Sequence, residues 1–470
     1  MNSKASTQTH TVTAPFSGEP IGRVPRAGSK QIERALGIAA ALHQDRDGWL
    51  ALHERVAILD RTAKLIEKNK NALAQQAAAE GGKPLIDSRA EIDRAIDGVR
   101  LAAEHIRADA GQVIPMGTTA ASAGRIAYTQ KEPRGIVVAV SAFNHPFNLI
   151  VHQVAAAIAA GCPTLVKPAQ DTPLSCMSFI KLLHEAGLPD PWCQFVLPEN
   201  NELTESMVTD ARVAFFSFIG SARVGWMLKS RLAPGTRCAL EHGGVAPLLV
   251  EADADLDKAV PAILKGGFYH AGQVCVSVQR VYAQEAIAEK LTKRLVDGAE
   301  ALIVGDPTDD QTEVGPLIRQ AEVERVDDWV QEAARSGADI RTGGRALDNQ
   351  CYAPTVLFDP PDDAQVSRKE VFGPVVCVYP YAEIDSAIER SNQLPYAFQA
   401  AIFTSSLDSA LRSSQRLNAS AVMVNDHTAF RVDHMPFAGL KESGYGVGGI
   451  GYTIDDMQID KMTVIRSDEL

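Results

Sequence analysis

The chain has 470 residues, of which 46% are hydrophobic and 22% are charged, and its formal net charge is -12. This is the composition of an ordinary globular protein, long enough for two or three domains. The acidic balance argues against binding to nucleic acid or to an anionic membrane surface. No apolar run approaches the roughly 20 residues that cross a bilayer, so we expect a soluble, cytoplasmic protein with a small-molecule substrate.

The first half of the chain predicts a parallel sheet. A long helix is expected at 54–80, before Gly81-Gly82-Lys83-Pro84, because apolar residues recur there at near-helical spacing. From Gly135 onward, short apolar runs alternate with amphipathic stretches. We expect strands at 136–140, 164–166, 194–197, 214–218 and 239–240, and helices at 147–160 and 173–186. Strands that alternate with helices predict a doubly wound sheet, which binds ligands beyond the carboxyl ends of its strands.

A second alternating region follows, with a helix expected at 285–301 and a strand at 375–378. Two α/β lobes with a site between them are therefore predicted. The segments 127–130 and 462–465 look like strands outside either sheet. Exposed strand edges often pair with another subunit, so we expect a homodimer or homotetramer.

Seven cysteines with no CxxC pair predict reduced thiols, without a disulfide framework or a metal site. One of them, Cys275, follows a small turn that contains Gly272. Its thiolate could attack a carbonyl carbon. A lone cysteine is more often a small buried side chain, and that interpretation stays open for Cys275 at this point.

Two more residues are suited to acyl chemistry. Glu241 ends an apolar strand and precedes Gly243-Gly244, which is a good place for a general base. Asn144 stands in a Ser-Ala-Phe-Asn-His-Pro segment, where its amide could donate to an oxyanion. The plain alternatives are a helix cap for either residue and a surface charge for Glu241.

Two strand ends are candidates for binding a dinucleotide. The segment with Gly220, Ser221 and Gly225 follows one strand and opens a helix, whose backbone N–H groups and dipole attract a pyrophosphate. It is not the G-x-G-x-x-G fingerprint, and an ordinary turn is the alternative. Lys167 and Gln170, at the end of another strand, are suited to an adenine-side ribose, and an ordinary loop is the alternative.

In their order along the chain, these segments resemble the aldehyde dehydrogenase superfamily over nearly the whole length. Further matching pieces are Glu132-Pro133-Arg134-Gly135, Gly315-Pro316-Leu317-Ile318, Glu370-Val371-Phe372-Gly373-Pro374 and Pro436-Phe437-Ala438-Gly439. The resemblance implies an α/β fold with two doubly wound domains and a small oligomerisation sheet. It implies a dinucleotide-binding domain at 1–117 and 136–242, a catalytic domain at 243–452, and bridging strands at 118–135 and 453–470.

The resemblance also implies roles. Cys275 would be the nucleophile, Glu241 the general base and Asn144 the oxyanion donor, while Glu370 would hold the nicotinamide ribose and Phe372 would pack near the nicotinamide. Such an enzyme oxidises an aldehyde to an acid through a thiohemiacetal and a thioester that water hydrolyses. Relatives that acylate coenzyme A commonly lack the glutamate, so a non-acylating reaction is expected. Coenzyme A acylation and a non-catalytic protein with the same fold are the alternatives.

The cofactor residues depart from the family's common pattern at one position. Lys167 would bind the adenine ribose, and Gln170 stands where strictly NAD-using relatives often have glutamate. A glutamate there would repel a 2′-phosphate, whereas glutamine does not. NAD is the expected cofactor, with NADP possible.

The substrate residues place the chain off the main branch. His145 replaces a common aromatic residue, and the Asn-His-Pro form is similar to relatives that act on small hydroxylated or anionic aldehydes, such as lactaldehyde, semialdehydes and phosphonate or sulfonate aldehydes. Arg431 lies where the substrate loop is expected. It either forks onto an anionic substrate group or forms a salt bridge with Asp433 or Asp426. His152 and Gln153, on the helix after Asn144, are further candidates to face the pocket, but the sequence does not fix the rotational phase of that helix.

Overall fold

The apolar run at 136–140 forms β5 (Ile136–Val140), which is buried at every residue in the middle of the first sheet. The computed structural model describes residues 8–470. In spatial order the six strands are β19 (Gly444–Tyr445), β9 (Arg237–Glu241), β8 (Val213–Ile219), β5, β6 (Thr164–Lys167) and β7 (Cys193–Phe195). The neighbouring strands run parallel, apart from β19 with β9. The carboxyl ends of β5, β6, β8 and β9 therefore meet at one edge.

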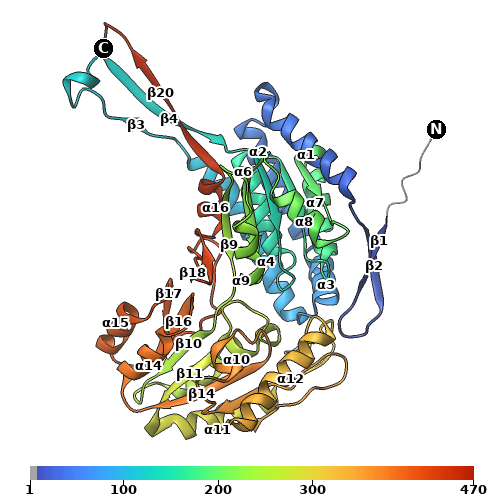
Figure 1. The fold of residues 1–470 in the computed structure, drawn as a ribbon, viewed down its shortest axis with the longest axis vertical. Helices are drawn as coiled ribbons and strands as arrows, with labels where there is room; N and C mark the ends of the chain where they lie inside the picture. Colours follow the sequence, from blue (N-terminus) through green and yellow to red (C-terminus); the bar gives the residue numbers. More distant parts are fainter. Residues whose placement is uncertain (1–7) are drawn as a thin grey trace.

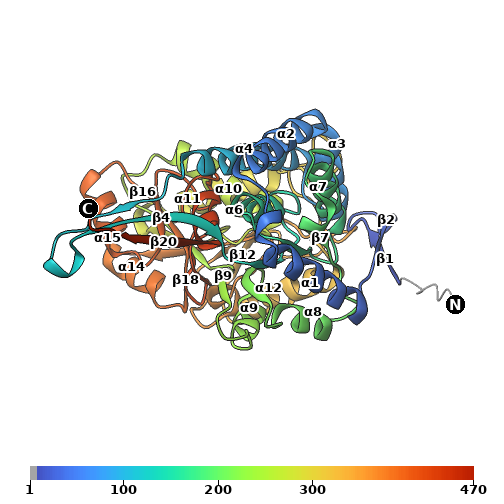
Figure 2. The same ribbon diagram turned by 90° about the horizontal axis from the view of Figure 1, so that it is seen from above.

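Helices cover both faces of this sheet, as Figure 2 shows from above. One face carries α2 (Leu52–Lys68), α3 (Lys70–Gly81), α4 (Leu85–Ala108), α7 (Pro173–Glu185), the helix formed by α5 (Asn148–Ile150), η3 (Val151–Ala155) and α6 (Ala156–Ala160), and α16 (Ile450–Asp456). The other face carries α1 (Ser29–Gln44), α8 (Asn201–Val208) and α9 (Ala222–Lys229). A hairpin of β1 (Thr9–Thr13) and β2 (Pro20–Pro25) precedes them.

The second lobe, yellow to orange in Figure 1, has a seven-stranded sheet. Its strands are β12 (Asp339–Thr342), β13 (Thr355–Phe358), β14 (Val375–Tyr381), β11 (Val278–Gln284), β10 (Ala246–Val250), β16 (Gln399–Phe403) and β17 (Ala421–Val424), and β12 is antiparallel to its neighbour. Its helices are α10 (Leu256–Phe268), α11 (Glu285–Ala301), α12 (Gln320–Arg335), α13 (Gln365–Arg368), α14 (Ile384–Asn392) and α15 (Leu407–Arg416). A short ladder of β15 (Tyr396–Ala397) and β18 (Leu440–Lys441) lies outside both sheets. The prediction of two doubly wound lobes is confirmed.

Two predicted helices differ in detail. The single helix expected at 54–80 is divided at Asn69, whose side chain donates to the carbonyl of Leu65 at 2.8 Å and so competes with the helical bonds. The helix expected at 147–160 contains a π-helical turn at Val151–Ala155. Wide turns of this kind are common near functional sites.

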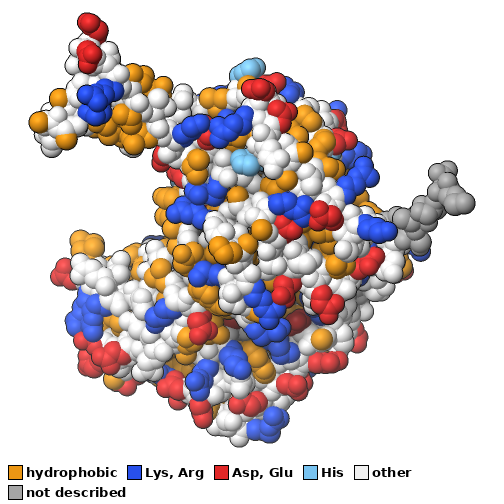
Figure 3. Space-filling model, turned by 45° about the horizontal axis from the view of Figure 1, so that its top comes forward, with side chains coloured by type: hydrophobic (Ala, Val, Ile, Leu, Met, Phe, Trp, Pro, Cys, Tyr) orange, Lys and Arg blue, Asp and Glu red, His pale blue; other side chains and the backbone are white. Residues whose placement is uncertain are grey.

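A third sheet projects as an arm from the upper left of Figure 1. It consists of β3 (Val113–Ile114), β4 (Arg125–Pro133) and β20 (Gln458–Arg466), and it includes both segments predicted as strands outside the main sheets. Apolar side chains gather on its surface in Figure 3. The chain enters this arm at β3, before residue 118, and it returns to the first lobe at β19, before residue 453. Both crossings come earlier than the predicted boundaries. Within residues 8–470, no helix is both long and apolar enough to cross a membrane.

Candidate active site

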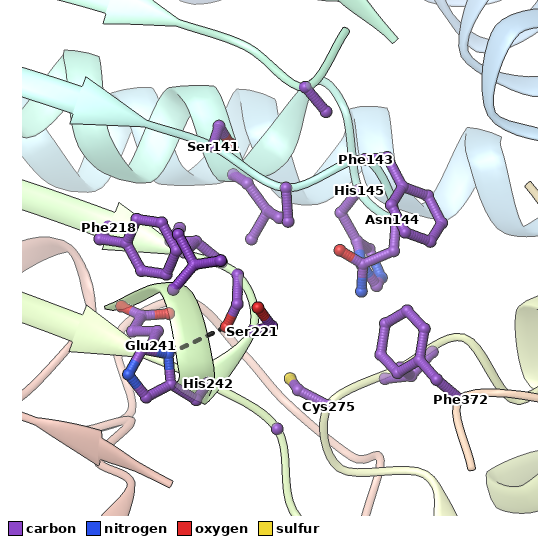
Figure 4. A pocket seen from close by; sticks show the side chains of 18 of the residues that line it. Ser141, Phe143, Asn144, His145, Phe218, Ser221, Glu241, His242, Cys275 and Phe372 are labelled. Atoms are coloured by element: carbon purple, nitrogen blue, oxygen red, sulfur yellow. Dashed lines mark hydrogen bonds between the residues drawn. The ribbon is translucent and has the colours of Figure 1, made fainter. Parts of the chain in front are cut away.

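A cleft of about 960 Å³ is lined by residues of both lobes, including the carboxyl ends of β5, β6, β8 and β9. It brings together almost all of the predicted site residues. These are Cys275, Glu241, Asn144, Lys167, Gln170, Gly220, Ser221, Glu370, Phe372, His145 and Arg431. Figure 4 shows that Glu241 comes from the end of a strand, Asn144 from the loop after another strand, and Cys275 from a loop of the second lobe.

The loop that carries Cys275 has an unusual backbone. His270, Ala271 and Gly272 all have positive φ, at 47°, 53° and 70°. A Cβ at Gly272 would lie 2.0 Å from the carbonyl oxygen of Gly373, so only glycine fits there. Gln273 then fastens the loop, because its side-chain oxygen accepts from the Ile318 N–H at 3.0 Å. These contacts place Cys275 in the cleft just before β11 begins.

Burial, together with the nearby Glu370 and Glu241 carboxylates, raises the pKa of the Cys275 thiol to about 12, although the Arg431 guanidinium acts in the opposite direction. The sulfur is therefore a neutral thiol at neutral pH in this state of the protein. Only the thiolate is a strong nucleophile. The positive charge of Arg431 is the local feature that favours the reactive form.

Glu241 is the last residue of β9, and it lies opposite Gly444 of β19. A Cβ at Gly448 would lie 2.1 Å from its carboxylate oxygen, so glycine leaves room for the side chain at that side. Burial raises the pKa of Glu241, although Arg431 lowers it. A carboxylate with a raised pKa is a stronger base, which suits proton abstraction from water.

Asn144 is 5% exposed, and its side-chain N–H donates to the carbonyl of Gln273 at 3.0 Å. This bond ties the amide to the loop that carries Cys275. An amide nitrogen has two hydrogens, so one stays free for a ligand in the cleft. The arrangement is suited to an oxyanion that forms on a carbon attached to the sulfur.

The end of the cleft where a dinucleotide is expected has hydrogen-bonding groups that are not fully satisfied within the protein. The Lys167 ammonium donates to the neighbouring Pro168 carbonyl at 3.2 Å, and burial lowers its pKa. Burial raises the pKa of Glu370 to about 8, and one of its carboxylate oxygens is buried without a hydrogen bond among the described residues. Gly220 and Ser221 stand just before α9, where the first N–H groups of a helix lack intrahelical partners, although the Gly220 N–H itself donates to the Glu241 carbonyl at 3.0 Å. These residues fit the ribose hydroxyls and the pyrophosphate of a nicotinamide dinucleotide.

Gly225 was predicted as a cofactor residue, but it does not line the cleft. It is buried on the side of α9 that faces His242, and a Cβ there would lie 2.0 Å from the His242 ring. His242 bonds in turn to the carbonyl of Gly220 at 2.9 Å (Figure 4). The glycine therefore allows the helix to pack, and His242, which the sequence analysis did not single out, supports the turn.

At the other end of the cleft, Arg431 has no ion-pair partner among residues 8–470. Its guanidinium stacks on the Phe437 ring at 3.6 Å, and its Nε and Nη2 atoms are buried without hydrogen bonds. Asp433 pairs instead with Arg94 at 2.7 Å and with His152 at 2.6 Å. The alternative of a salt bridge from Arg431 is therefore not observed among residues 8–470, because other donors surround the Asp433 carboxylate and Asp426 lies near His427 instead.

Sequence reasoning missed two residues at this end, Arg94 and Tyr269, which both line the cleft. Arg94 comes from α4, and no sequence pattern connects it with Cys275. The Tyr269 hydroxyl bonds to His145 at 2.9 Å, and its place in the cysteine segment was the available signal. His152 lines the cleft, whereas Gln153 donates to Val140 and Ser217 inside the first lobe.

Residues 2–463 match the sequence model of the aldehyde dehydrogenase family. A 3-sulfolactaldehyde dehydrogenase of Priestia megaterium is 38% identical over 96% of this chain and 94% of its own. Aldehyde dehydrogenase 21 of Physcomitrella patens, solved with the reaction product succinate, is 34% identical, with a TM-score of 0.94 and coverage of 99% and 96%. Glyceraldehyde-3-phosphate dehydrogenase GapN of Methanocaldococcus jannaschii, solved with NADP, is 34% identical, with a TM-score of 0.93 and coverage of 98% and 100%. The predicted fold class and enzyme class are confirmed, and the chain belongs to the aldehyde dehydrogenase family.

Proposed function

We propose that the protein oxidises a small anionic aldehyde to the carboxylic acid with a nicotinamide dinucleotide, and that water rather than coenzyme A releases the product. The observation that carries the substrate class is the Arg431 guanidinium, which lines the cleft together with Cys275 and has no carboxylate partner among the described residues. Its Nε and Nη2 atoms are buried without hydrogen bonds, and buried polar atoms are costly unless a ligand satisfies them. An anionic group on the substrate would do so.

The prediction of a nicotinamide cofactor is confirmed by the solved relatives, which include NADP-bound enzymes. Lys167 and Gln170 would hold the adenine ribose, the Gly220–Ser221 turn the pyrophosphate, and Glu370 the nicotinamide ribose. When bound, the nicotinamide accepts the hydride that converts the Cys275 thiohemiacetal into a thioester. No contact among the described residues distinguishes NAD from NADP. The expectation of NAD, with NADP as the alternative, therefore still rests on the sequence.

The chain's own residues would perform the remaining steps. The Cys275 thiolate adds to the aldehyde carbon, and the Asn144 amide, with the Cys275 backbone N–H, donates to the oxygen that becomes negative. Glu241 then takes a proton from water as the water attacks the thioester. The C–S bond breaks, the sulfur leaves as the thiolate, and the free acid departs.

The compounds named for three relatives support an anionic substrate, because each carries an anionic group. Sulfolactaldehyde carries a sulfonate, succinate a second carboxylate, and glyceraldehyde 3-phosphate a phosphate. A guanidinium fork matches each of these groups with two parallel hydrogen bonds. His145 and Tyr269 line the same end and would contact a hydroxyl group near the aldehyde.

The test is a panel of aldehydes assayed by dinucleotide reduction, with sulfonate, phosphonate, semialdehyde, lactaldehyde and neutral aliphatic members. We expect Arg431→Ala to lower kcat/KM for the anionic aldehydes by roughly 10- to 100-fold more than for the neutral ones, because the accompanying rise in the pKa of Cys275 affects both classes alike. Arg319→Ala is the matched control, because it removes another guanidinium of the cleft. An equal loss for neutral and anionic aldehydes would refute the assignment.

Two alternatives are separated by the products of the same assay. A free acid without coenzyme A supports hydrolysis, whereas turnover that depends on coenzyme A and yields a thioester supports acylation. A protein that reduces no dinucleotide with any aldehyde would favour a non-catalytic role.

We also propose a homodimer or homotetramer in which the arm contacts a second copy, because Ile126, Met462, Val464 and Ile465 are each at least 45% exposed on it. Light scattering would test this, and a monomer at micromolar concentration would contradict it. A cytoplasmic location stays a prediction.

A further inference from the structure

Lys83 and Glu91 form an ion pair whose two side chains are both 0% exposed, in the first lobe beside the cleft. Lys83 follows the left-handed Gly82 at the end of α3, and Glu91 lies in α4. Taking two charges out of water costs several kcal/mol for each ion, so such a pair needs additional hydrogen bonds. The steps described so far give neither residue a role.

The additional hydrogen bonds all go to the segment that contains Asn144. One Glu91 carboxylate oxygen accepts from the backbone N–H groups of Phe147 at 2.8 Å and Asn148 at 2.9 Å. The Lys83 ammonium donates to the backbone carbonyl of Asn144 at 3.3 Å. The pair therefore holds the peptide of Asn144 itself and the start of the helix that follows it.

A second buried carboxylate in the same lobe shows what this arrangement adds. Glu80, also 0% exposed, accepts from the backbone N–H groups of Leu174 at 2.8 Å and Ser175 at 2.7 Å at the start of α7. Among residues 8–470 it has no salt-bridge partner, and burial raises its pKa to about 7. A buried glutamate alone is thus enough to hold a helix start in this fold. The lysine beside Glu91 adds the bond to Asn144.

We propose that Lys83 and Glu91 are positioning residues for the oxyanion site. The Asn144 side chain is held by the Gln273 carbonyl, and its backbone is held by Lys83 and Glu91. An oxyanion donor is effective only when it is fixed before the charge develops, and an error of about 1 Å costs on the order of 100-fold in rate. This inference rests on the proposed role of Asn144 as the oxyanion donor.

The experiment compares two reactions of Cys275 in the full-length protein. Acylation by p-nitrophenyl acetate proceeds by attack of the thiolate on the carbonyl carbon, through an oxyanion that collapses with loss of p-nitrophenolate. Alkylation by iodoacetamide displaces iodide from carbon and forms no oxyanion. The ratio of the two rates therefore reports oxyanion stabilisation and cancels changes in thiolate fraction.

Asn144→Ala is the reference variant, because it removes the proposed oxyanion donor itself. We expect it to lower the ratio of the acylation rate to the alkylation rate by about 100-fold. We expect Glu91→Gln to lower it by about 10-fold, because the lysine loses its partner and the bond to Asn144 shifts. The double variant Lys83→Met/Glu91→Gln has no unpaired buried charge, so it serves if the single variant does not fold. It should give the same loss, since the donor to the Asn144 carbonyl is absent.

Glu80→Gln is the matched control, and its ratio should equal that of the unchanged protein. A folded Glu91→Gln or double variant with the unchanged ratio, while Asn144→Ala loses it, overturns the positioning role. An unchanged ratio in Asn144→Ala instead refutes the proposed role of Asn144. The affinity for NAD, measured by fluorescence titration, should be the same in all variants.

Discussion

The two ends of the cleft are built in different ways. At the dinucleotide end, the groups that would touch the ligand are a strand-to-helix turn at Gly220–Ser221 and side chains at or near strand ends, such as Lys167. At the aldehyde end, side chains such as Arg94 and Arg431 come from segments more than 300 residues apart and meet around Asp433 and Cys275.

This difference determines what single substitutions do. A ligand held by many polar groups, some of them backbone N–H groups, loses little affinity when one side chain changes. A site made of a few buried side chains loses either its chemistry or its selectivity when one of them is removed. The predictions below test this contrast, in order of the expected effect.

The largest effect should come from the nucleophile. Cys275→Ala removes the atom that forms the covalent bond, so kcat should fall by at least about 1,000-fold. The affinity for NAD, measured by fluorescence titration, should not change. Cys351→Ala removes a buried thiol outside the cleft and should keep its activity. A full-rate Cys275→Ala protein would eliminate the covalent mechanism.

Replacement of the base should separate the first turnover from the later ones. In Glu241→Gln, the thioester still forms but water is not activated, so steady-state kcat should fall by about 100-fold. A stopped-flow trace should show a burst of reduced dinucleotide close to one per site. Loss of the burst together with the steady rate would show that Glu241 acts before the thioester forms.

The pH dependence of thiol alkylation follows from the raised pKa. Because the pKa of Cys275 is about 12, the thiolate fraction rises tenfold for each pH unit below it, and alkylation should be about 100-fold faster at pH 9 than at pH 7. Arg431→Met should slow alkylation at every pH, since the guanidinium lowers this pKa. A rate that reaches a plateau near pH 8 would contradict the prediction.

The smallest effect is expected at the dinucleotide end. Gln170→Glu should increase the preference for NAD over NADP by about 10-fold, because the new carboxylate repels a 2′-phosphate. The ratio of kcat/KM for the two cofactors measures it. Gln284→Glu adds the same charge at the start of α11 in the second lobe and should leave the ratio unchanged. If Gln170→Glu changed the cofactor preference by a larger factor than Arg431→Ala changes kcat/KM for anionic aldehydes, the expected contrast between the two ends would be reversed.

Much of the dinucleotide end was predictable from sequence, because a parallel sheet places strand ends side by side. Lys167, Gly220 and Glu241 follow apolar strands, and the structure brings them into one cleft. The family resemblance added Glu370 and Phe372, which no local pattern indicates. Gly225 does not line the cleft, and the sequence does not tell whether a glycine on a helix allows approach of a ligand or of a ring such as that of His242.

The aldehyde end was less predictable, because its contacts connect distant segments. The sequence left two partners for Arg431, and the choice depends on Arg94 and His152, which occupy Asp433 from another lobe. The Lys83–Glu91 pair was not predicted either, because its contacts with the segment that contains Asn144 also connect distant parts of the chain. Hydrophobic periodicity indicates which face of a helix is buried, but it does not indicate which charge is buried with it.

The chain passes from β9 to β10 through residues 242–245, so Glu241 belongs to the first lobe and Cys275 to the second. The proposed base and the proposed nucleophile are therefore carried by different lobes joined by a short link. A hinge rotation between the lobes would change the distance between the carboxylate and the sulfur without altering either element. A ligand that contacts both lobes would therefore fix the distance between these two side chains as well as bind in the cleft.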